Sequence, residues 1–152
     1  MIRTALILAL ALAGGASAQT DRADQTGHAV PQVSPVPDYP FVGARYGMTA
    51  ICRASHNVSA DGRAVDICVT CAIGGFFEPP RSAVSRATRK FTEATEEALE
   101  QWRYGEEYWG YRGVQTQFEF ALSEASLSRL PRAPVMGECP GSDGAPTGAP
   151  QE

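Results

Sequence analysis

The residues of this sequence with the most potential for chemistry are its four cysteines, and two of them form a C-x-x-C motif, Cys68-Val69-Thr70-Cys71. In thiol oxidoreductases this motif begins a helix, whose dipole lowers the pKa of a thiol. Here the neighbouring residues are typical of a strand, and positions i and i+3 of a strand point to opposite faces. We therefore expect Cys68 and Cys71 not to pair with each other, and a thiol oxidoreductase is kept only as an alternative.

The same cysteines could instead hold zinc or form structural disulfides. A zinc site would draw on Cys52, Cys68, Cys71 and either His56 or Cys139, but these side chains would not share a face. An even number of cysteines in an exported chain favours disulfides. We expect a Cys52–Cys71 disulfide, because these residues lie opposite each other in a predicted hairpin. A Cys68–Cys139 disulfide then follows by elimination. No metal and no cofactor is expected.

No other group of polar residues predicts an enzyme. The histidines, His28 and His56, complete no Ser/His/Asp or Cys/His triad. A cluster of glutamates has the spacing of a solvated helix face, with a metal or acid–base site as the alternative. An aromatic loop could either face a partner or fold back on the core. The glutamates are Glu93, Glu96, Glu97 and Glu100, and the loop aromatics are Tyr108, Trp109 and Tyr111.

The cysteines are positioned by a predicted β-hairpin. Residues 48–58 and 63–73 read as two strands, and the Asp61-Gly62 pair between them is a strong turn signal. A two-residue loop at Asp61-Gly62 would place Val58 opposite Val65, Ala54 opposite Val69 and Cys52 opposite Cys71. One face then collects the apolar side chains and the other face is polar, as in antiparallel sheets that cover a core on one side. The predicted core face comprises Cys52, Ala54, Val58, Val65, Ile67, Val69, Cys71 and Ile73.

A helix and a third strand follow the hairpin. Residues 92–104 predict a helix, with an apolar stripe at Phe91, Thr95, Ala98 and Trp102 and a stop at Gly105. We expect residues 76–90 to form a long connection, with a short helical turn near Ser82–Thr88. Residues 113–122 alternate between apolar and polar side chains and predict a half-buried strand.

These elements predict an α+β fold in which a three-stranded antiparallel sheet is covered by one main helix. The chain returns along the helix, so the third strand runs parallel to the second and antiparallel to the first. Pairing with the first strand gives the order 2-1-3, counted along the chain, and leaves the third strand at an edge. An edge strand of this kind can accept an extended peptide.

Composition and the chain ends set the wider context. The chain has 152 residues and a net charge of −4, which favours one domain and argues against a nucleic-acid binder. Residues 1–18 resemble a signal peptide, with Arg3, an apolar stretch and an Ala16-Ser17-Ala18 cleavage site, so we expect a periplasmic protein. Residues 19–37 predict a disordered lead-in, residues 38–125 the folded domain and residues 126–152 a flexible Pro/Gly-rich tail.

Several of these segments resemble the C-terminal domain of TonB-type energy transducers, in the order found in that family. The hairpin Val58-Ser59-Ala60-Asp61-Gly62-Arg63-Ala64-Val65-Asp66 is similar to the family's D-G-R turn. The segment Ala98-Leu99-Glu100-Gln101-Trp102-Arg103-Tyr104 is similar to its A-L-x-x-W-R-Y pattern. Tyr39-Pro40 with Gly43-Ala44 and Gly47, and the strand from Gly113 to Leu122, complete the match. The signal peptide expected at residues 1–18, where the energy transducers have a membrane anchor, is a departure from the family's pattern.

The resemblance implies a protein-binding module that takes part in transmembrane transport. The implied partner is the N-terminal peptide of an outer-membrane TonB-dependent transporter, which would add to the third strand as a further strand. Candidate contacts are Arg112, Gln115, Gln117 and Glu119 on and beside that strand. Another envelope protein as partner, a homodimer through the sheet edge, and a small exported disulfide-stabilised envelope protein remain alternatives.

Overall fold

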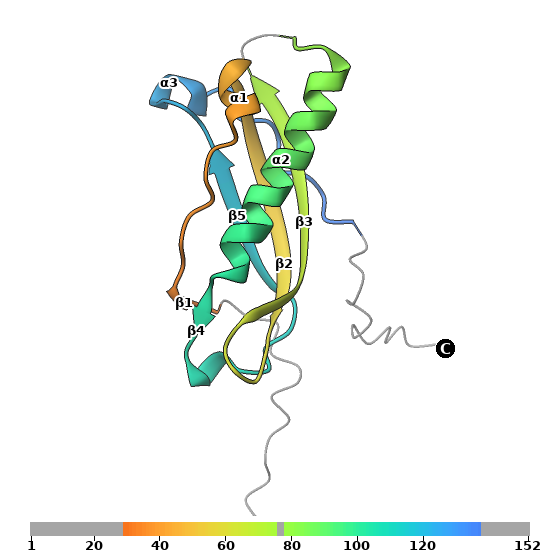
Figure 1. Cartoon of the computed structure of the whole chain (residues 1–152). Coiled ribbons are helices and arrows are strands. Elements are labelled where there is room, and N and C mark those ends of the chain that lie inside the picture. The colour runs from red at the N-terminus through yellow and green to blue at the C-terminus, as the bar shows by residue number, and fades with distance from the viewer. Residues whose placement is uncertain (1–28, 76–77, 138–152) are drawn as a thin grey trace, which may run out of the picture.

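A long helix, α2, covers one face of a three-stranded sheet in the computed structural model (Figure 1). The structure describes residues 29–75 and 78–137, so the predicted signal peptide lies outside the described residues. A short 3-10 helix lies at Glu106–Tyr108. The other elements are β1 (Pro31–Val33), α1 (Phe41–Arg45), β2 (Met48–Val58), β3 (Ala64–Gly75), α2 (Arg81–Glu100), β4 (Arg103–Tyr104), β5 (Val114–Phe120) and α3 (Glu124–Leu127).

The main sheet has the order β3-β2-β5, and both pairings are antiparallel. The first arm of the hairpin, β2, therefore lies in the middle, between β3 and β5. The predicted α+β class, with a three-stranded antiparallel sheet and a helix on one face, is confirmed. The structure adds a small second sheet, in which β1 pairs with β4, that the sequence did not predict.

The hairpin register follows the prediction far from the turn and departs from it near the turn. Cys52 lies opposite Cys71 and Ala54 opposite Val69, as expected. Nearer the turn, Val58 lies opposite Ala64 instead of Val65. Val65 consequently leaves the predicted core face, and 37% of its surface is exposed.

A β-bulge in β3 causes this change of register. Between the Ser55–Cys68 and Asn57–Val65 pairs, β3 has two residues where β2 has only His56. One of the two is Asp66, which adopts a positive φ of 52°, a conformation that a short polar side chain tolerates. The predicted two-residue loop is therefore wrong: residues 60–62 form a three-residue loop, with Gly62 at φ 77°.

Helix α2 begins earlier and ends earlier than predicted. It starts at Arg81, directly after Pro79-Pro80, so most of the expected connection 76–90 is helical. It ends at Glu100, with Gln101 as C-cap, and the chain then enters β4 instead of continuing to the expected stop at Gly105. Trp102 thus lies beyond the helix, and its indole Nε1 donates a hydrogen bond to the carbonyl oxygen of Pro35 at 3.1 Å.

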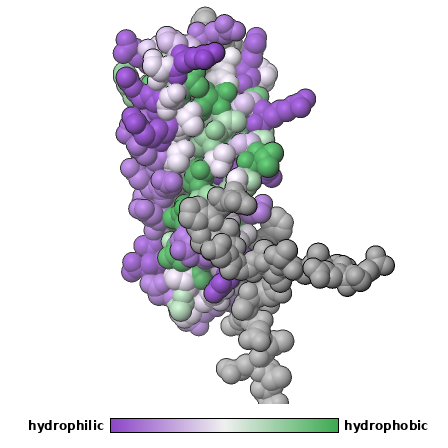
Figure 2. Space-filling view, turned by 90° about the vertical axis from the view of Figure 1, so that its right-hand side faces the viewer, coloured by the Kyte–Doolittle hydropathy of each residue, from purple (hydrophilic) through white to green (hydrophobic). Residues whose placement is uncertain are grey.

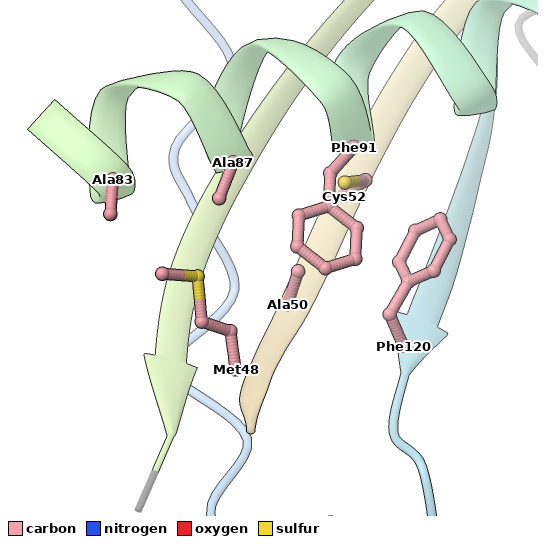
Figure 3. Close-up of a cluster of buried hydrophobic side chains, with 7 residues drawn as sticks. All are labelled: Met48, Ala50, Cys52, Ala83, Ala87, Phe91 and Phe120. Carbon is pink, nitrogen blue, oxygen red and sulfur yellow. The ribbon is translucent and has the colours of Figure 1, made fainter. Parts of the chain in front are cut away.

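The core between α2 and the sheet has two clusters of buried side chains. Figure 3 shows the first, in which the Phe91 ring points from α2 toward β2 and lies beside the Phe120 ring of β5, with centroids 4.8 Å apart. Ala83 and Ala87 let the helix approach the end of the sheet near Met48. The second cluster lies near the hairpin turn and contains Ala54, Val58, Ala64, Leu99, Trp102, Tyr104 and Val114.

Segments on either side of the predicted domain also pack against it. Pro31–Val33, in the expected disordered lead-in, forms β1 and pairs with β4. Beyond β5, residues 128–137 run behind β2 and β3, on the face that α2 does not cover (Figure 1). Thr49 Oγ1 donates to the carbonyl oxygen of Arg129 at 2.8 Å, and Arg53 Nη1 donates to that of Pro134 at 3.4 Å. The predicted polar face is therefore partly covered by the chain itself, and Thr49 and Ile51 are buried there.

Candidate functional site

The candidate docking site is the outer edge of β5. Within residues 29–75 and 78–137, β5 pairs with β2 on one side, and no strand is hydrogen-bonded to its other side. A strand in this position presents a row of backbone N–H and C=O groups that another chain can use for pairing. The edge is therefore suited to strand addition.

The register identifies which backbone groups face outward. Val58 N donates to the carbonyl oxygen of Tyr111 at 2.7 Å, and Gly110 N donates to the carbonyl oxygen of Val58 at 3.0 Å. Both the N–H and the C=O group of Val58 therefore point to the side of β2 on which β5 lies. Backbone direction alternates along a strand, so Cys52 and Ala54 also direct their N–H and C=O groups toward β5.

The short Cα–Cα distance of 4.1 Å between Cys52 and Cys71 agrees with this alternation, because it is typical of a pair that is not hydrogen-bonded. The β5 residues opposite Cys52 and Ala54 are Phe118 and Thr116. The N–H and C=O groups of Phe118 and Thr116 consequently point toward β2. Those of Gln115, Gln117 and Glu119 point away from the sheet.

The side chains of the outward-facing residues lie on the sheet face opposite α2. Gln115, Gln117 and Glu119 are exposed, and Gln117 Nε2 donates to Glu119 Oε1 at 3.2 Å. Arg112 is also exposed, just before β5, where Gly113 N is fixed by a 3.0 Å hydrogen bond to Asn57 Oδ1. The four contact residues expected from the sequence thus lie along the outer edge of β5. Their amide and charged side chains can bind the side chains of a partner strand there.

Exposed apolar side chains accompany the same edge on the α2 side, and the sequence did not predict them. The segment 34–40 runs beside β5 in Figure 1, and the Tyr39 ring lies 6.2 Å from that of Phe120, between centroids. Val36 of this segment is 81% exposed, and Phe41 in α1 is 80% exposed. Leu122 and Leu127, which follow β5, are about half exposed. A strand added to β5 would therefore find polar groups on one face and apolar groups on the other.

The aromatic loop folds back on the core. Trp109 Nε1 donates to the carbonyl oxygen of Tyr104 at 3.4 Å. The rings of Tyr104, Tyr108 and Tyr111 form a chain of edge-to-face contacts, with centroids 6.3 and 5.4 Å apart. Of the two roles considered for this loop, the structure therefore supports packing against the core.

One of the two expected disulfides, Cys52–Cys71, is confirmed. Cys52 and Cys71 form a disulfide across the β2–β3 pair. Cys68 is disulfide-bonded as well, and Cys139 lies outside the described residues. Since Cys71 is bridged to Cys52, the C-x-x-C cysteines are not paired with each other. The described part of the chain contains no group of three or more His, Cys, Asp or Glu side chains placed to hold a metal ion.

His56 has a structural position that the sequence did not reveal. It is 1% exposed, on the middle strand, and its Nε2 lies 2.6 Å from the hydroxyl oxygen of Tyr104. Burial lowers the pKa of His56 to about 4 and raises that of the Tyr104 hydroxyl well above its usual value. His56 is therefore neutral near pH 7 and does not supply a charge to the surface.

The fold and the site define a small α+β protein with an open sheet edge and a disulfide-stabilised hairpin. None of the helices in the described residues has the length and apolar character needed to cross a membrane.

No family model and no curated protein matches the chain. Among solved structures, it is similar to one described as the TonB2 protein from Vibrio anguillarum, with 20% identity, coverage of 80% of this chain and 100% of that chain, and a TM-score of 0.43. A TM-score of 0.43 is too low to assign a family.

Proposed function

We propose that this chain is a periplasmic protein-binding module, similar to the TonB C-terminal domain, that docks an extended peptide of an outer-membrane transporter. The peptide would add as a strand to the outer edge of β5. The observation that carries this proposal is the outward direction of the backbone groups of Gln115, Gln117 and Glu119, on an edge to which no described strand is paired. The role is binding rather than catalysis.

The residues that resemble the TonB family support the proposal, because they build this edge. Trp102 lies between the lead-in and β5: it bonds to Pro35, and its ring lies 5.7 Å from that of Phe118, between centroids. Gly62, in the D-G-R turn, accepts a hydrogen bond at its carbonyl from Tyr104 N at 2.8 Å. These contacts tie the hairpin, the end of α2 and β5 together, and so hold the edge in a fixed position.

In this mode of docking, backbone hydrogen bonds supply affinity, and alternate side chains supply specificity. The peptide would place polar side chains beside Gln115, Gln117 and Arg112. Its other side chains would lie toward the exposed Val36 and Leu122. The partner best suited to the edge is therefore an extended segment that alternates between apolar and polar residues.

The proposed location is the periplasm, reached by the signal sequence in residues 1–18, and the disulfides suit an oxidising compartment. A small envelope protein stabilised by disulfides, with no transporter partner, is the alternative. A thiol oxidoreductase is less well supported, because Cys71 is bonded to Cys52 across the hairpin.

The test compares Gln117→Pro with Gln117→Thr at the same position. Proline removes the outward N–H of residue 117 without removing a hydrogen bond to β2, whereas threonine keeps that N–H. The probes are fluorescent synthetic peptides that cover the N-terminal segments of the outer-membrane transporters encoded in the same genome. We expect at least one peptide to bind the wild type and Gln117→Thr, and binding to Gln117→Pro to weaken at least tenfold, as measured by anisotropy. Equal binding by both variants would contradict docking at β5, and binding of no transporter peptide would contradict the proposed partner.

A further inference from the structure

Residues 128–137 form a strap across the face of the sheet that α2 does not cover. At the start of the strap, Thr49 Oγ1 donates to the carbonyl oxygen of Arg129 at 2.8 Å. Further along it, Arg53 Nη1 donates to the carbonyl oxygen of Pro134 at 3.4 Å. Since Thr49 precedes Arg53 in β2, the strap runs in the direction of β2, toward the hairpin turn.

The first part of the strap packs closely on the sheet at Gly74 of β3. A Cβ added to Gly74 would lie 2.8 Å from the carbonyl oxygen of Arg129 and 3.2 Å from Pro131 Cδ. The side chains of Thr49 and Ile51 are buried on the same face. The start of the strap is therefore part of the folded protein.

The far end of the strap is held less firmly by the sheet. The hydrogen bond between Arg53 and Pro134 is long, and Val135 is 88% exposed. In Figure 1 this end of the strap emerges beside β3. Figure 2 views the molecule from that side and shows a band of apolar surface flanked by polar surface. Apolar surface offers few hydrogen bonds, so a covalent anchor would add much to the attachment of this end.

Cys68 of β3 is the next residue on the course of the strap. It lies opposite Ser55, which is two residues beyond Arg53 in β2. Side chains two apart in a strand, and those of opposed residues, lie on the same face of a sheet. Cys68 therefore shares the strap-covered face with Arg53, and it is partly exposed there.

The remaining cysteine of the sequence lies within reach of Cys68. Cys52 and Cys71 are bonded to each other, and Cys68 is disulfide-bonded as well, so Cys139 is the one partner left in the chain. Cys139 follows Pro134 by five residues, which span up to about 17 Å when extended. The step along and across the sheet from the level of Pro134 to Cys68 is about 8 Å.

We propose that Cys68 is bonded to Cys139 and that this bridge is a site of thiol–disulfide exchange, which determines whether the end of the strap stays on the sheet. The reductant is a dithiol. One of its thiolates attacks a sulfur of the bridge and forms a mixed disulfide, and its second thiolate then displaces the protein cysteine. The dithiol is oxidised to a disulfide, and its two protons end on the thiols of Cys68 and Cys139.

The two bridges of the chain differ in their access to such a reductant. Cys52 is fully buried beneath α2, and the Thr92 hydroxyl of this helix lies 3.6 Å from Cys71 Sγ. Cys68 lies on the opposite face, away from α2. Exchange requires a thiolate to approach a disulfide sulfur directly. The Cys52–Cys71 bridge is therefore protected, whereas the Cys68 bridge is open to exchange.

The first test reduces the oxidised wild-type chain with dithiothreitol. Tandem mass spectrometry of the unreduced chain should find Cys68 linked to Cys139. At limiting dithiothreitol, alkylation should label these two cysteines at least tenfold faster than Cys52 and Cys71. A different partner for Cys68, or earlier opening of the Cys52–Cys71 bridge, would overturn the inference.

The second test measures release of the strap by trypsin, which cleaves after Arg129 and Arg132. In Cys68→Ser/Cys139→Ser, cleavage at these two sites should be at least tenfold faster than in the oxidised wild type. Cleavage after the basic residues of α2 should stay as slow as in the wild type, which shows that the rest of the fold is intact. Equal cleavage of the strap in both proteins would contradict its attachment by the bridge.

The matched control is Cys52→Ala/Cys71→Ala, which removes the protected bridge. This variant should not raise cleavage of the strap relative to cleavage of α2, and a selective rise there would also count against the inference. Neither test depends on a peptide bound at β5. Failure of the strap inference and failure of the proposed docking are therefore distinguishable.

Discussion

His56 and Tyr104 are joined inside the protein, with the Nε2 atom of one 2.6 Å from the hydroxyl oxygen of the other. This contact connects the middle strand, β2, to β4, the strand that follows α2. The other ring nitrogen, Nδ1, is buried and has no hydrogen-bond partner among the described residues. The His56 ring also lies edge-on to the Trp102 ring, with centroids 6.0 Å apart. A charged imidazolium therefore has no carboxylate beside it in these contacts to offset its burial.

This environment predicts that the fold loses stability in mild acid. The pKa of His56 is about 4 in the folded chain and about 6.5 when unfolded, so between these values the unfolded chain binds a proton that the folded chain does not. The free energy of unfolding should fall by about 3 kcal/mol as the pH drops from 6.5 to 4. Urea denaturation at several pH values measures this effect. His56→Gln, which cannot titrate, should show a smaller fall, and identical pH dependence of the two proteins would contradict the assignment.

The position of Gly62 in the hairpin loop predicts that replacing it with a larger residue destabilises the fold. Its φ is +77°, and a Cβ added there would lie 2.6 Å from the carbonyl oxygen of Tyr104 and 2.7 Å from Trp109 Nε1. Gly62→Ala should therefore destabilise the protein by about 2 kcal/mol or more. Gly110→Ala is a matched control, because Gly110 has a similar φ of +81° but no atom within 4 Å of the added Cβ. Thermal unfolding should show the larger loss for Gly62→Ala, and equal losses would contradict the close contact.

The Cys52–Cys71 disulfide predicts a further stability difference. It links residues that are 19 apart in sequence, and on the chain-entropy model a bridge of this length stabilises the fold by about 3 kcal/mol. The double variant Cys52→Ala/Cys71→Ala should lose about that amount in denaturant unfolding under non-reducing conditions. A reducing agent should then destabilise the wild type more than the variant. If the double variant is as stable as the wild type, the disulfide does not stabilise the hairpin.

The parts of the fold that the sequence predicted well are those with a strong local pattern. Strands β2, β3 and β5 have runs of apolar or alternating residues, and the Asp61-Gly62 pair marks the turn between the first two. The Cys52–Cys71 bond was predicted from a two-residue loop, and it is present because the extra residue of the bulge offsets the longer loop. The edge position of β5 followed from the chain direction through the helix.

The parts that the sequence missed depend on small residues or on contacts made only in the folded chain. The first half of α2 buries Ala83 and Ala87, whose small side chains leave a weak apolar stripe among serines and arginines. The bulge at Asp66 shifts the register by one residue, and turn chemistry alone did not predict it. Burial of His56 depends on Tyr104, which is 48 residues away in the sequence.

The most direct test of the account is the amide hydrogen exchange of β5, measured residue by residue by NMR on the oxidised chain. Without peptide, the inward amides of Thr116 and Phe118 should be protected, and the outward amides of Gln115, Gln117 and Glu119 should exchange much faster. A bound transporter peptide should slow the exchange of these three. Protection of all five amides without peptide, or a bound peptide that leaves the outward three unprotected, would contradict docking by strand addition at β5.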